Sequence, residues 1–198
     1  MKTFQEIKEQ IITMAKKAGA CEGQFKRVLN SENEQDLMRV IKGNISWCYN
    51  NLDLILMLDL FDINLCVEFG IYHKGEIESI TNKKGLIFLG DFKCKMLDNS
   101  QVSEMMGNSQ VSVMRGNSQV GEMWGNSQVG EMWGNSQVGE MWVNSQVGEM
   151  WDNSQVGEMR GNSISRSYNC NLPKYGGDRY CYVDLKNNKV YIGENLSL

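Results

Sequence analysis

The hydrophobic positions at the start of the chain recur at helical spacing. The apolar residues at intervals of three or four are Phe4, Ile7, Ile11, Ala15 and Ala18. Thr3 and Glu6 stand three apart in the order of a capping box, in which side chain and backbone satisfy each other's amides. Gly19 stands where a helix would end. The spacing therefore predicts a first helix from Phe4 to about Ala18.

Three further helices are expected before residue 65. Ser31 to Glu34 repeats the capping pattern, and a second set of apolar residues at helical spacing follows it: Leu37, Met38, Val40, Ile41 and Ile45. A short helix is expected around Cys21–Leu29, and another over Leu52–Ile63. Trp47 is expected to close the core of this bundle. Residues 1–65 are thus predicted to form a helical module.

From about Leu65 the hydrophobic period moves from 3.6 towards 2. Val67–Tyr72 and Leu86–Leu89 alternate as strands do, with a turn at residues 83–85. The segment Gly90–Asp98 has Met96 at the place where the later repeats carry Met. Residues 66–98 are therefore predicted to be a strand-rich entry that ends in a degenerate first coil.

A nine-residue unit, Asn-Ser-Gln-Val-Gly-Glu-Met-Trp-Gly, repeats without a gap from Asn99 to Gly161. Such a period is typical of a solenoid, in which each unit stacks on its neighbour. The fourth position is always Val and the seventh always Met, so these two and the small Ser at the second are expected inside. Position six is Glu in all copies but Val113, and is expected outside. The eighth position varies between apolar and charged and is also expected outside: Met106, Arg115, Trp124, Trp133, Trp142, Trp151 and Arg160.

The spacing of the core positions predicts two corners in each unit. Ser and Val fit one strand face, but Val and Met are three apart, so one corner is expected near the fifth position and another at Gly-Asn. Val143 and Asp152 replace the ninth-position Gly, so Gly is not expected to be strictly required for a positive φ angle there. The Asn side chains are expected to form an amide ladder.

Two units per coil is the simplest closure, giving three to four coils for seven units. This register stacks Trp124 on Trp142 and Trp133 on Trp151, and each edge also carries a Glu row. An antiparallel meander with Gly-Asn turns is the alternative. Calcium-binding coils are excluded because the repeats lack the aspartates.

The end of the chain is expected to cap the array. After residue 164 the repeat pattern decays, and Arg179–Asp184 and Lys189–Ile192 are predicted to form a hairpin. Solenoids need such atypical ends to cover an edge that would otherwise pair with other chains. The predicted fold class is α+β: a helical module (1–65), an entry segment (66–98), a short β-solenoid (99–164) and a capping segment (165–198).

The net charge of −4 is unevenly distributed. The array from Asn99 to Gly161 holds six Glu and Asp152 against Arg115 and Arg160, a balance of −5, and no Lys occurs between Lys95 and Lys174. Binding to a phosphate backbone needs Lys and Arg. The array is therefore not expected to bind nucleic acid directly.

Other features of the composition exclude further classes. No apolar run reaches the ~18 residues of a membrane helix, and the first residues lack a signal-peptide core, so no membrane contact and a cytoplasmic location are expected. The six cysteines contain no Cys-x-x-Cys pair and are expected to be free buried thiols, with no metal and no cofactor. His73, the only histidine, belongs to no catalytic motif and is expected in a turn or at the surface. The chain is not expected to be an enzyme.

Two helical segments, Met14–Glu22 and Ile45–Cys48, precede strands and an Asn-Ser-x-Val array. With this arrangement most of the chain resembles a family of uncharacterised proteins from gut bacteria and their phages or mobile elements. The segment Ala18–Cys21 is the more specific marker. The resemblance implies a small, rapidly diversifying accessory protein and carries no known activity.

These observations predict a non-catalytic interaction protein. The expected binding residues form Trp and Glu ladders on the array: Trp124, Trp133, Trp142, Trp151, Glu122, Glu131, Glu140 and Glu149. Exposed Trp marks contact sites, and acidic rows imitate nucleic acid to a basic partner. With the phage-like resemblance, the most specific hypothesis is an inhibitor of a host defence nuclease, similar to anti-CRISPR proteins. The alternatives are solvating charge, a carbohydrate or surface binder that uses stacked Trp, and a self-assembling structural protein.

An exposed row of Trp also predicts self-association. A twofold axis would bury the same apolar stripe against itself while keeping the acidic rows offset. We therefore expect a homodimer through the repeat edge, unless the chain's end modules or a foreign partner cover the stripe.

Overall fold

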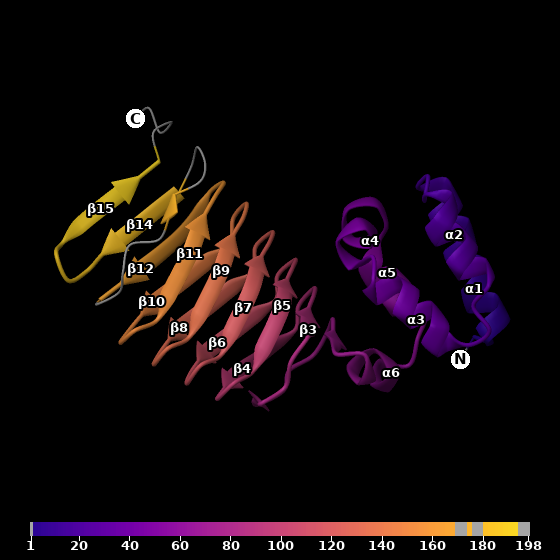
Figure 1. The fold of residues 1–198 in the computed structure, drawn as a ribbon, viewed down its shortest axis with the longest axis horizontal. Coiled ribbons are helices and arrows are strands. Elements are labelled where there is room, and N and C mark those ends of the chain that lie inside the picture. The colour runs from indigo at the N-terminus through magenta and orange to yellow at the C-terminus, as the bar shows by residue number, and fades with distance from the viewer. Residues whose placement is uncertain (1, 169–173, 176–179, 194–198) are drawn as a thin grey trace. The chain divides into compact units, whose positions relative to one another are not determined.

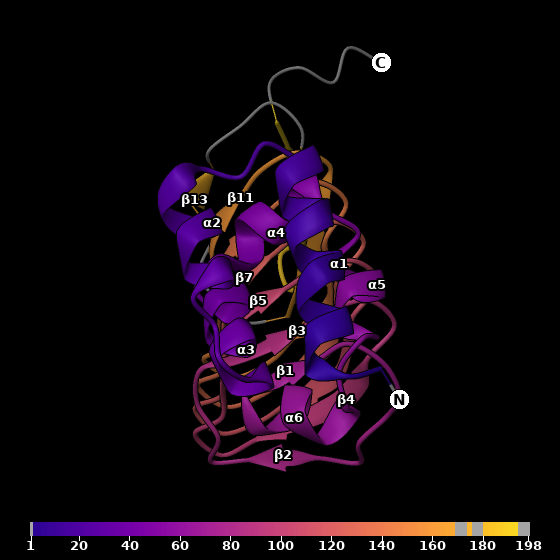
Figure 2. The ribbon, with the colours of Figure 1, turned by 90° about the vertical axis from the view of Figure 1, so that its right-hand side faces the viewer.

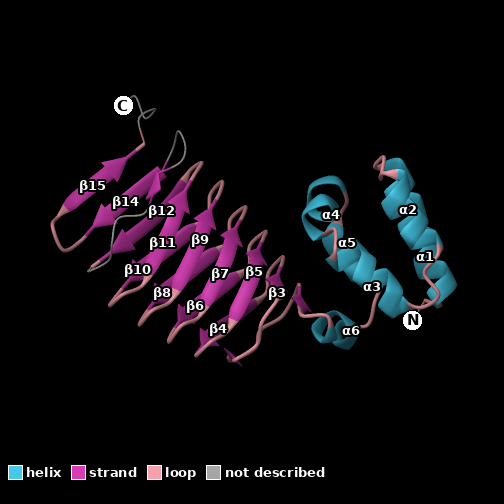
Figure 3. Ribbon diagram, viewed as in Figure 1, coloured by secondary structure: helices cyan, strands magenta, loops and turns pink. Residues whose placement is uncertain are grey.

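A computed structural model describes residues 2–168, 174–175 and 180–193. The chain divides into two compact units, Met1–Ile71 and Tyr72–Leu198, which are described separately. The first consists of helices and the second is built almost entirely of strands (Figure 3).

The helical unit contains α1 (Phe4–Lys17), α2 (Glu22–Leu29), α3 (Glu34–Lys42), α4 (Ile45–Asn51), α5 (Leu54–Leu58) and α6 (Ile63–Glu68). The predicted capping box at the start of α1 is confirmed. The Glu6 amide donates to Thr3 Oγ1 at 3.3 Å, and the Thr3 amide donates to Glu6 Oε2 at 2.7 Å. Ile7, Ile11 and Ala15 form the buried face of this helix, as their spacing predicts.

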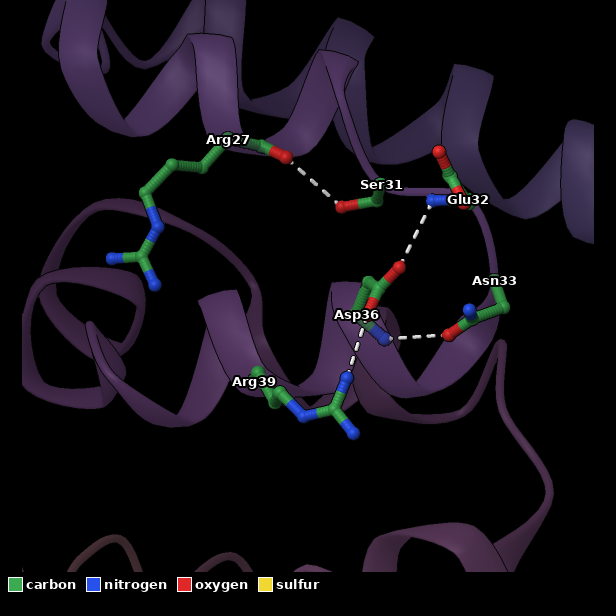
Figure 4. Close-up of polar contacts among 6 residues, drawn as sticks. All are labelled: Arg27, Ser31, Glu32, Asn33, Asp36 and Arg39. Atoms are coloured by element: carbon green, nitrogen blue, oxygen red, sulfur yellow. Dashed lines mark hydrogen bonds and ion pairs between the residues drawn. The ribbon is translucent and has the colours of Figure 1, made fainter.

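The start of α3 is capped by a residue other than the one expected. Asn33, rather than Ser31, is the N-cap, and its Oδ1 accepts the Asp36 amide at 2.9 Å (Figure 4). The Asp36 carboxylate also accepts the Glu32 amide at 3.1 Å and Arg39 Nη1 at 2.6 Å. These contacts satisfy the free amides of a helix start and fix the entry into α3, so we interpret the cluster as structural.

Two expectations around residues 52–72 are wrong. A single helix over Leu52–Ile63 does not form, and α5 covers only Leu54–Leu58. The strand expected at Val67–Tyr72 is reduced to Ile71–Tyr72, because α6 takes up the residues before it. The Asp62 carboxylate accepts the Asn64 amide at 2.7 Å and so starts a helix that the alternating pattern concealed.

The second unit is a parallel β-solenoid (Figure 1). Its strands are β1 (Ile71–Tyr72), β2 (Ile80–Thr81), β3 (Leu86–Phe88), β4 (Lys93–Leu97), β5 (Gln101–Met105), β6 (Gln110–Met114), β7 (Gln119–Met123), β8 (Gln128–Met132), β9 (Gln137–Met141), β10 (Gln146–Met150), β11 (Gln155–Met159), β12 (Ser163–Ser167), β13 (Lys174–Tyr175), β14 (Tyr180–Asp184) and β15 (Lys189–Ile192). One sheet has the order β1-β3-β5-β7-β9-β11-β13, and the other β15-β14-β12-β10-β8-β6-β4-β2. The expected α+β class is confirmed.

Successive strands alternate between the two sheets, so one coil contains two nonapeptides. Gln101 pairs with Gln119 and Val102 with Val120, eighteen residues apart and parallel. β9 continues this register from β7. Figure 2 looks along the stacked coils, so that strands of one sheet such as β3, β5 and β7 lie one behind another. The closure of two units per coil is confirmed, and the antiparallel meander is wrong. The coils begin before the exact repeats, since β4 of the Met96 segment pairs with β6.

The core of the solenoid consists of the three positions that the repeats predict. The second-position Ser, the fourth-position Val and the seventh-position Met are buried in every nonapeptide from Asn99 to Gly161. Parallel strands place each of them above its equivalent in the preceding coil. The interior is therefore a set of columns of identical side chains between two sheets.

The fifth residue of each unit is an extra residue within the strand, and not the corner expected there. Val129 pairs with Val147 and Glu131 with Glu149, while the fifth-position glycines between them stay outside this register. The bulge lets Val and Met point inward although they are three apart. β4 and β12 lack the extra residue and show simple alternation of burial. The repeat is thus an eight-residue half-coil with one bulge residue, stacked from coil to coil.

The bulge explains why the fifth position changes from Ser to Gly along the array. A Cβ atom on Gly121 would lie 2.5 Å from the carbonyl oxygen of Ser103, and one on Gly139 would lie 2.5 Å from that of Gly121. Real Cβ atoms do not approach so closely. Ser103 and Ser112 are the first bulge residues of their sheets, because β3 and β4 shift register opposite them. In every later copy the fifth-position residue stacks on the bulge residue of the preceding coil, and this residue is Gly.

The ninth position has a left-handed backbone in every described copy, and Val143 and Asp152 adopt it without being Gly, as their substitution predicts. Val143 has φ of 61° and Asp152 of 56°, close to the 70° of Gly125. The adjacent Asn side chains form the expected ladder. Asn126 Nδ2 donates to Asn108 Oδ1 at 3.2 Å, and each Asn repeats the contact eighteen residues later.

The C-terminal hairpin is confirmed over its described residues. β14 continues one sheet in parallel from β12, and β15 pairs antiparallel with β14 through the turn at residues 185–188. Arg179, the expected first residue of the hairpin, lies outside the described residues. The antiparallel strand ends the parallel stacking of that sheet.

Candidate functional site: the tryptophan and glutamate ladders

The predicted binding residues are arranged in two ladders. The first ladder comprises Glu122, Trp124, Glu140 and Trp142, at the ends of β7 and β9. The second ladder comprises Glu131, Trp133, Glu149 and Trp151, at the ends of β8 and β10. Because β7 and β9 belong to one sheet and β8 and β10 to the other, each ladder follows one sheet. The structure brings together all eight predicted residues in two groups of four.

The indole rings are stacked face to face along the solenoid, as predicted. The ring centroids of Trp124 and Trp142 are 4.8 Å apart with 2° between the ring planes. Those of Trp133 and Trp151 are 5.1 Å apart with 7° between the planes. The spacing equals the distance between parallel strands, so the register of the strands sets the stacking.

Each stack also has a partner at its C-terminal end. The guanidinium of Arg160 lies 4.5 Å from the ring centroid of Trp142, a cation–π contact. Tyr168 stacks on Trp151 at 3.9 Å. The sequence showed Arg160 at the eighth position without predicting this contact. Tyr168 was missed because the last half-coil is one residue shorter, which shifts the repeat count.

Every ladder glutamate accepts a hydrogen bond from the indole two residues after it. The Nε1–Oε2 distances are 2.8 Å for Trp124 and Glu122, 2.8 Å for Trp133 and Glu131, 3.1 Å for Trp142 and Glu140, and 3.3 Å for Trp151 and Glu149. An indole N–H bound to a carboxylate is a charge-assisted hydrogen bond. Each Glu is thus held in place by the Trp beside it.

The tryptophans are less exposed than their sequence pattern suggests. All four are half-buried, as are the four glutamates. Stacking covers the ring faces within each ladder, and the indole N–H is occupied by Glu. The rings therefore offer their edges, and the carboxylates offer the oxygen that does not bind the indole.

The ladders give the array a dense negative charge. Each central coil adds one Glu to each of the two ladders and is about 4.8 Å high, so these coils carry roughly one carboxylate per 2.4 Å of the solenoid axis. Duplex DNA carries about one phosphate charge per 1.7 Å. Arg160 Nε donates to Glu158 Oε1 at 2.6 Å and so offsets the charge at one end of the array. Val113 and Arg115 replace the Glu–Trp pair near the other end.

The other candidate groups, His73 and the cysteines, are not ladder residues. His73 is buried rather than at the surface, because it directly follows the buried strand β1. Burial raises the pKa of the Cys48 thiol to about 11 and that of Cys94 to about 12, since an apolar site disfavours the thiolate. Cys66 is also buried, but Cys21 is exposed, so the expectation that all the thiols are buried is wrong. Cys170 lies outside the described residues.

The described residues include no group of three metal-ligating side chains close enough to hold an ion. Within the same residues, no helix combines the length and the hydropathy needed to cross a membrane. Comparison with protein-family models, curated proteins and solved structures finds no match.

Proposed function

We propose that this chain is a non-catalytic interaction protein that binds a basic protein surface through the two ladders. The observation that carries the proposal is the pairing of each ladder Glu with the adjacent stacked Trp, as in Glu122 and Trp124. The pairing presents fixed carboxylates at about 70% of the axial charge density of duplex DNA. Fixed charges lose little conformational entropy when a partner binds.

The charge also suits this class of partner. The array has a balance of −5 with no Lys between Lys95 and Lys174, so a basic groove would be attracted, most strongly to the coils between Arg115 and Arg160. Opposite charge increases the rate of encounter and selects the register of docking. Indole edges beside the carboxylates would add apolar contact, which prolongs the bound state.

The finer proposal is that the partner is a basic nucleic-acid-binding enzyme of a bacterial host, and that the chain inhibits it by occupying its groove. Its support is the regular, dense row of carboxylates and the resemblance to accessory proteins of phages and mobile elements. We place this activity in the cytoplasm, where free thiols such as Cys48 and Cys66 stay reduced.

The stacked geometry favours this function over carbohydrate binding. A sugar ring stacks on an exposed aromatic face, whereas the inner faces of Trp124 and Trp142 cover each other and Arg160 lies over Trp142. The exposed edges of the indoles are better suited to side chains of a protein partner. Dimerisation through these edges stays a proposal, and light scattering at high micromolar concentration tests it.

The function is tested by a variant with Glu122, Glu131, Glu140 and Glu149 all changed to Gln. The amide oxygen of Gln still accepts the indole N–H, so the fold should be retained while four charges are lost. Binding is measured by anisotropy of a labelled arginine-rich peptide at increasing salt. We expect the native chain to bind with an affinity that falls with salt, and the variant to bind at least tenfold more weakly.

A matched control changes four exposed glutamines of the same strands, Gln119, Gln128, Gln137 and Gln146, to Ala. This control should bind like the native chain. Equal peptide affinity for the native chain and the Glu variant would refute the role of the ladders. The inhibitory activity is then assayed as displacement of labelled duplex DNA from purified bacterial nucleases by the native chain and the Glu variant.

A further inference from the structure

The helical unit contains a pocket that the ladders do not explain. It has a volume of about 330 Å³ and is lined by residues from α1 to α5, including the buried Ile11, Ile41 and Met57. Ligand pockets in proteins fall between ~300 and ~1,000 Å³, so this one is large enough to hold a small molecule.

Small residues at the end of α1 create the space. Ala15, Gly19 and Ala20 line the pocket together with the larger Phe25 and Trp47. Larger side chains at the three small positions would fill the volume with chain atoms. An unfilled apolar space lowers stability. A bound molecule that fills it would recover the lost contacts.

The lining limits the chemistry of the occupant. No Asp, Glu, Lys or Arg lines the pocket, so a charged molecule would lose its hydration without contacting a counter-charge in the lining. Two half-buried amides, Gln24 and Asn44, are the main polar side chains there. Asn44 Nδ2 donates to Gln24 Oε1 at 3.2 Å and to Val40 O at 2.7 Å. Arg27 Nη1, which does not line the pocket, also donates to Gln24 Oε1 at 3.2 Å. Asn44 Oδ1 and Gln24 Nε2 are then the atoms of the two amides that could bind one polar group of a ligand.

We propose that the helical unit binds a neutral, mainly apolar molecule about the size of a bicyclic aromatic compound, with one hydroxyl or amide group directed at Gln24 and Asn44. The size follows from the volume, since an apolar cavity of about 150 Å³ takes up benzene. The polar group supplies orientation, and the apolar body supplies the contact area. The site depends on the helical unit alone and is independent of the function proposed for the array.

The test uses the full chain, ¹⁵N-labelled, with 1-naphthol as the ligand. Trp47 is the only tryptophan outside the array, and its indole N–H signal is identified with the Trp47→Phe variant. We expect this signal to shift and saturate with added 1-naphthol while the four array indole signals stay in place. Absence of a shift at about 1 mM ligand would overturn the proposal.

Filling the pocket gives the decisive comparison. Ala20→Phe should weaken 1-naphthol binding at least tenfold, whereas Leu56→Phe, an exposed site on α5 outside the pocket, should bind like the native chain. Naphthalene-1-carboxylate should bind at least tenfold more weakly than 1-naphthol because of its charge. Equal affinity of Ala20→Phe and native chain, or of the carboxylate and the naphthol, would contradict the proposal.

A second variant keeps the test decisive if Ala20→Phe disturbs the helices. Gln24→Met removes the amide at similar volume. In the native chain 1-naphthol should bind more tightly than naphthalene. In Gln24→Met the affinities of the two ligands should differ by no more than about twofold. An unchanged ratio would show that the amides do not bind the hydroxyl.

Discussion

Val143 has a backbone conformation that its side chain opposes. Its φ of 61° lies in the left-handed region, where a β-branched residue is a marked outlier. The same position in the other described copies is Gly, apart from Asp152. The carboxylate of Asp152 accepts the Gly134 amide at 3.0 Å, a contact that Val lacks. Val143 is therefore strained without compensation.

Val143→Gly should stabilise the array. Relief of left-handed strain contributes about 1–2 kcal/mol, and the greater freedom of Gly in the unfolded chain removes about 0.4–1 kcal/mol of that gain. We expect a net increase in the free energy of unfolding of about 0.5–1 kcal/mol, measured by urea denaturation with array Trp fluorescence. Asp152→Gly is the control and should give no gain. Destabilisation by Val143→Gly would contradict this account.

The fifth-position glycines should tolerate no side chain. Gly139→Ala places a Cβ 2.5 Å from the carbonyl oxygen of Gly121 and should destabilise the array by about 2 kcal/mol through overpacking. Gly23→Ala, with nothing within 4 Å in α2, should instead raise helix stability by about 0.5–1 kcal/mol. Urea denaturation followed by Trp fluorescence and by far-ultraviolet circular dichroism separates the two effects. A neutral Gly139→Ala would rule out the stacked bulge.

At the level of elements, the repeat was predictable because its copies vary. Arg and Trp exchange at the eighth position while Val and Met do not change, so the inside of the coil follows from the sequence. The outside follows only in part, because Met106, at an eighth position expected outside, is buried. The segment Val67–Tyr72 was not predictable in this way. Its alternating residues fit a strand, but the Asp62 cap starts a helix first.

The half-burial of the tryptophans could not be read from one repeat. It arises only when Trp124 and Trp142 stack in adjacent coils and each indole finds Glu two residues before it. The only sign of the bulge in the sequence was that Val and Met stand three residues apart, a spacing that does not fit one face of a regular strand. Its position depends on the eight-residue half-coils at β4 and β12.

Trp142→Ala tests the ladder as an element. The change removes the stack on Trp124 and the contact with Arg160, and we expect a loss of about 2 kcal/mol, less than for a fully buried Trp. Trp142→Phe should keep most of the stability. In a double-mutant cycle with Arg160→Ala, the coupling should be about 1 kcal/mol. Additive effects of the two changes would show that the cation–π contact contributes nothing.

At the scale of the whole molecule, the number of coils should be adjustable. Deleting residues 117–134 removes one coil and joins two identical corners, so the fold should persist with a loss on the order of a few kcal/mol from one interface between coils. Deleting residues 126–130 leaves an incomplete strand and should abolish cooperative unfolding of the array. Circular dichroism and thermal denaturation compare the two deletions. Equal outcomes would contradict the nearest-neighbour account.

The alternation of strands between two sheets makes copy number a matter of parity. Each added nonapeptide turns the rest of the chain by half a revolution about the solenoid axis, so one more unit would move the β14–β15 hairpin from one sheet to the other. Two more units would return it to its original side, one coil further along. Arrays with an odd and with an even number of units would thus carry the hairpin on opposite sheets relative to the first coils. A partner that contacts both the hairpin and the first coils would therefore bind arrays of only one parity.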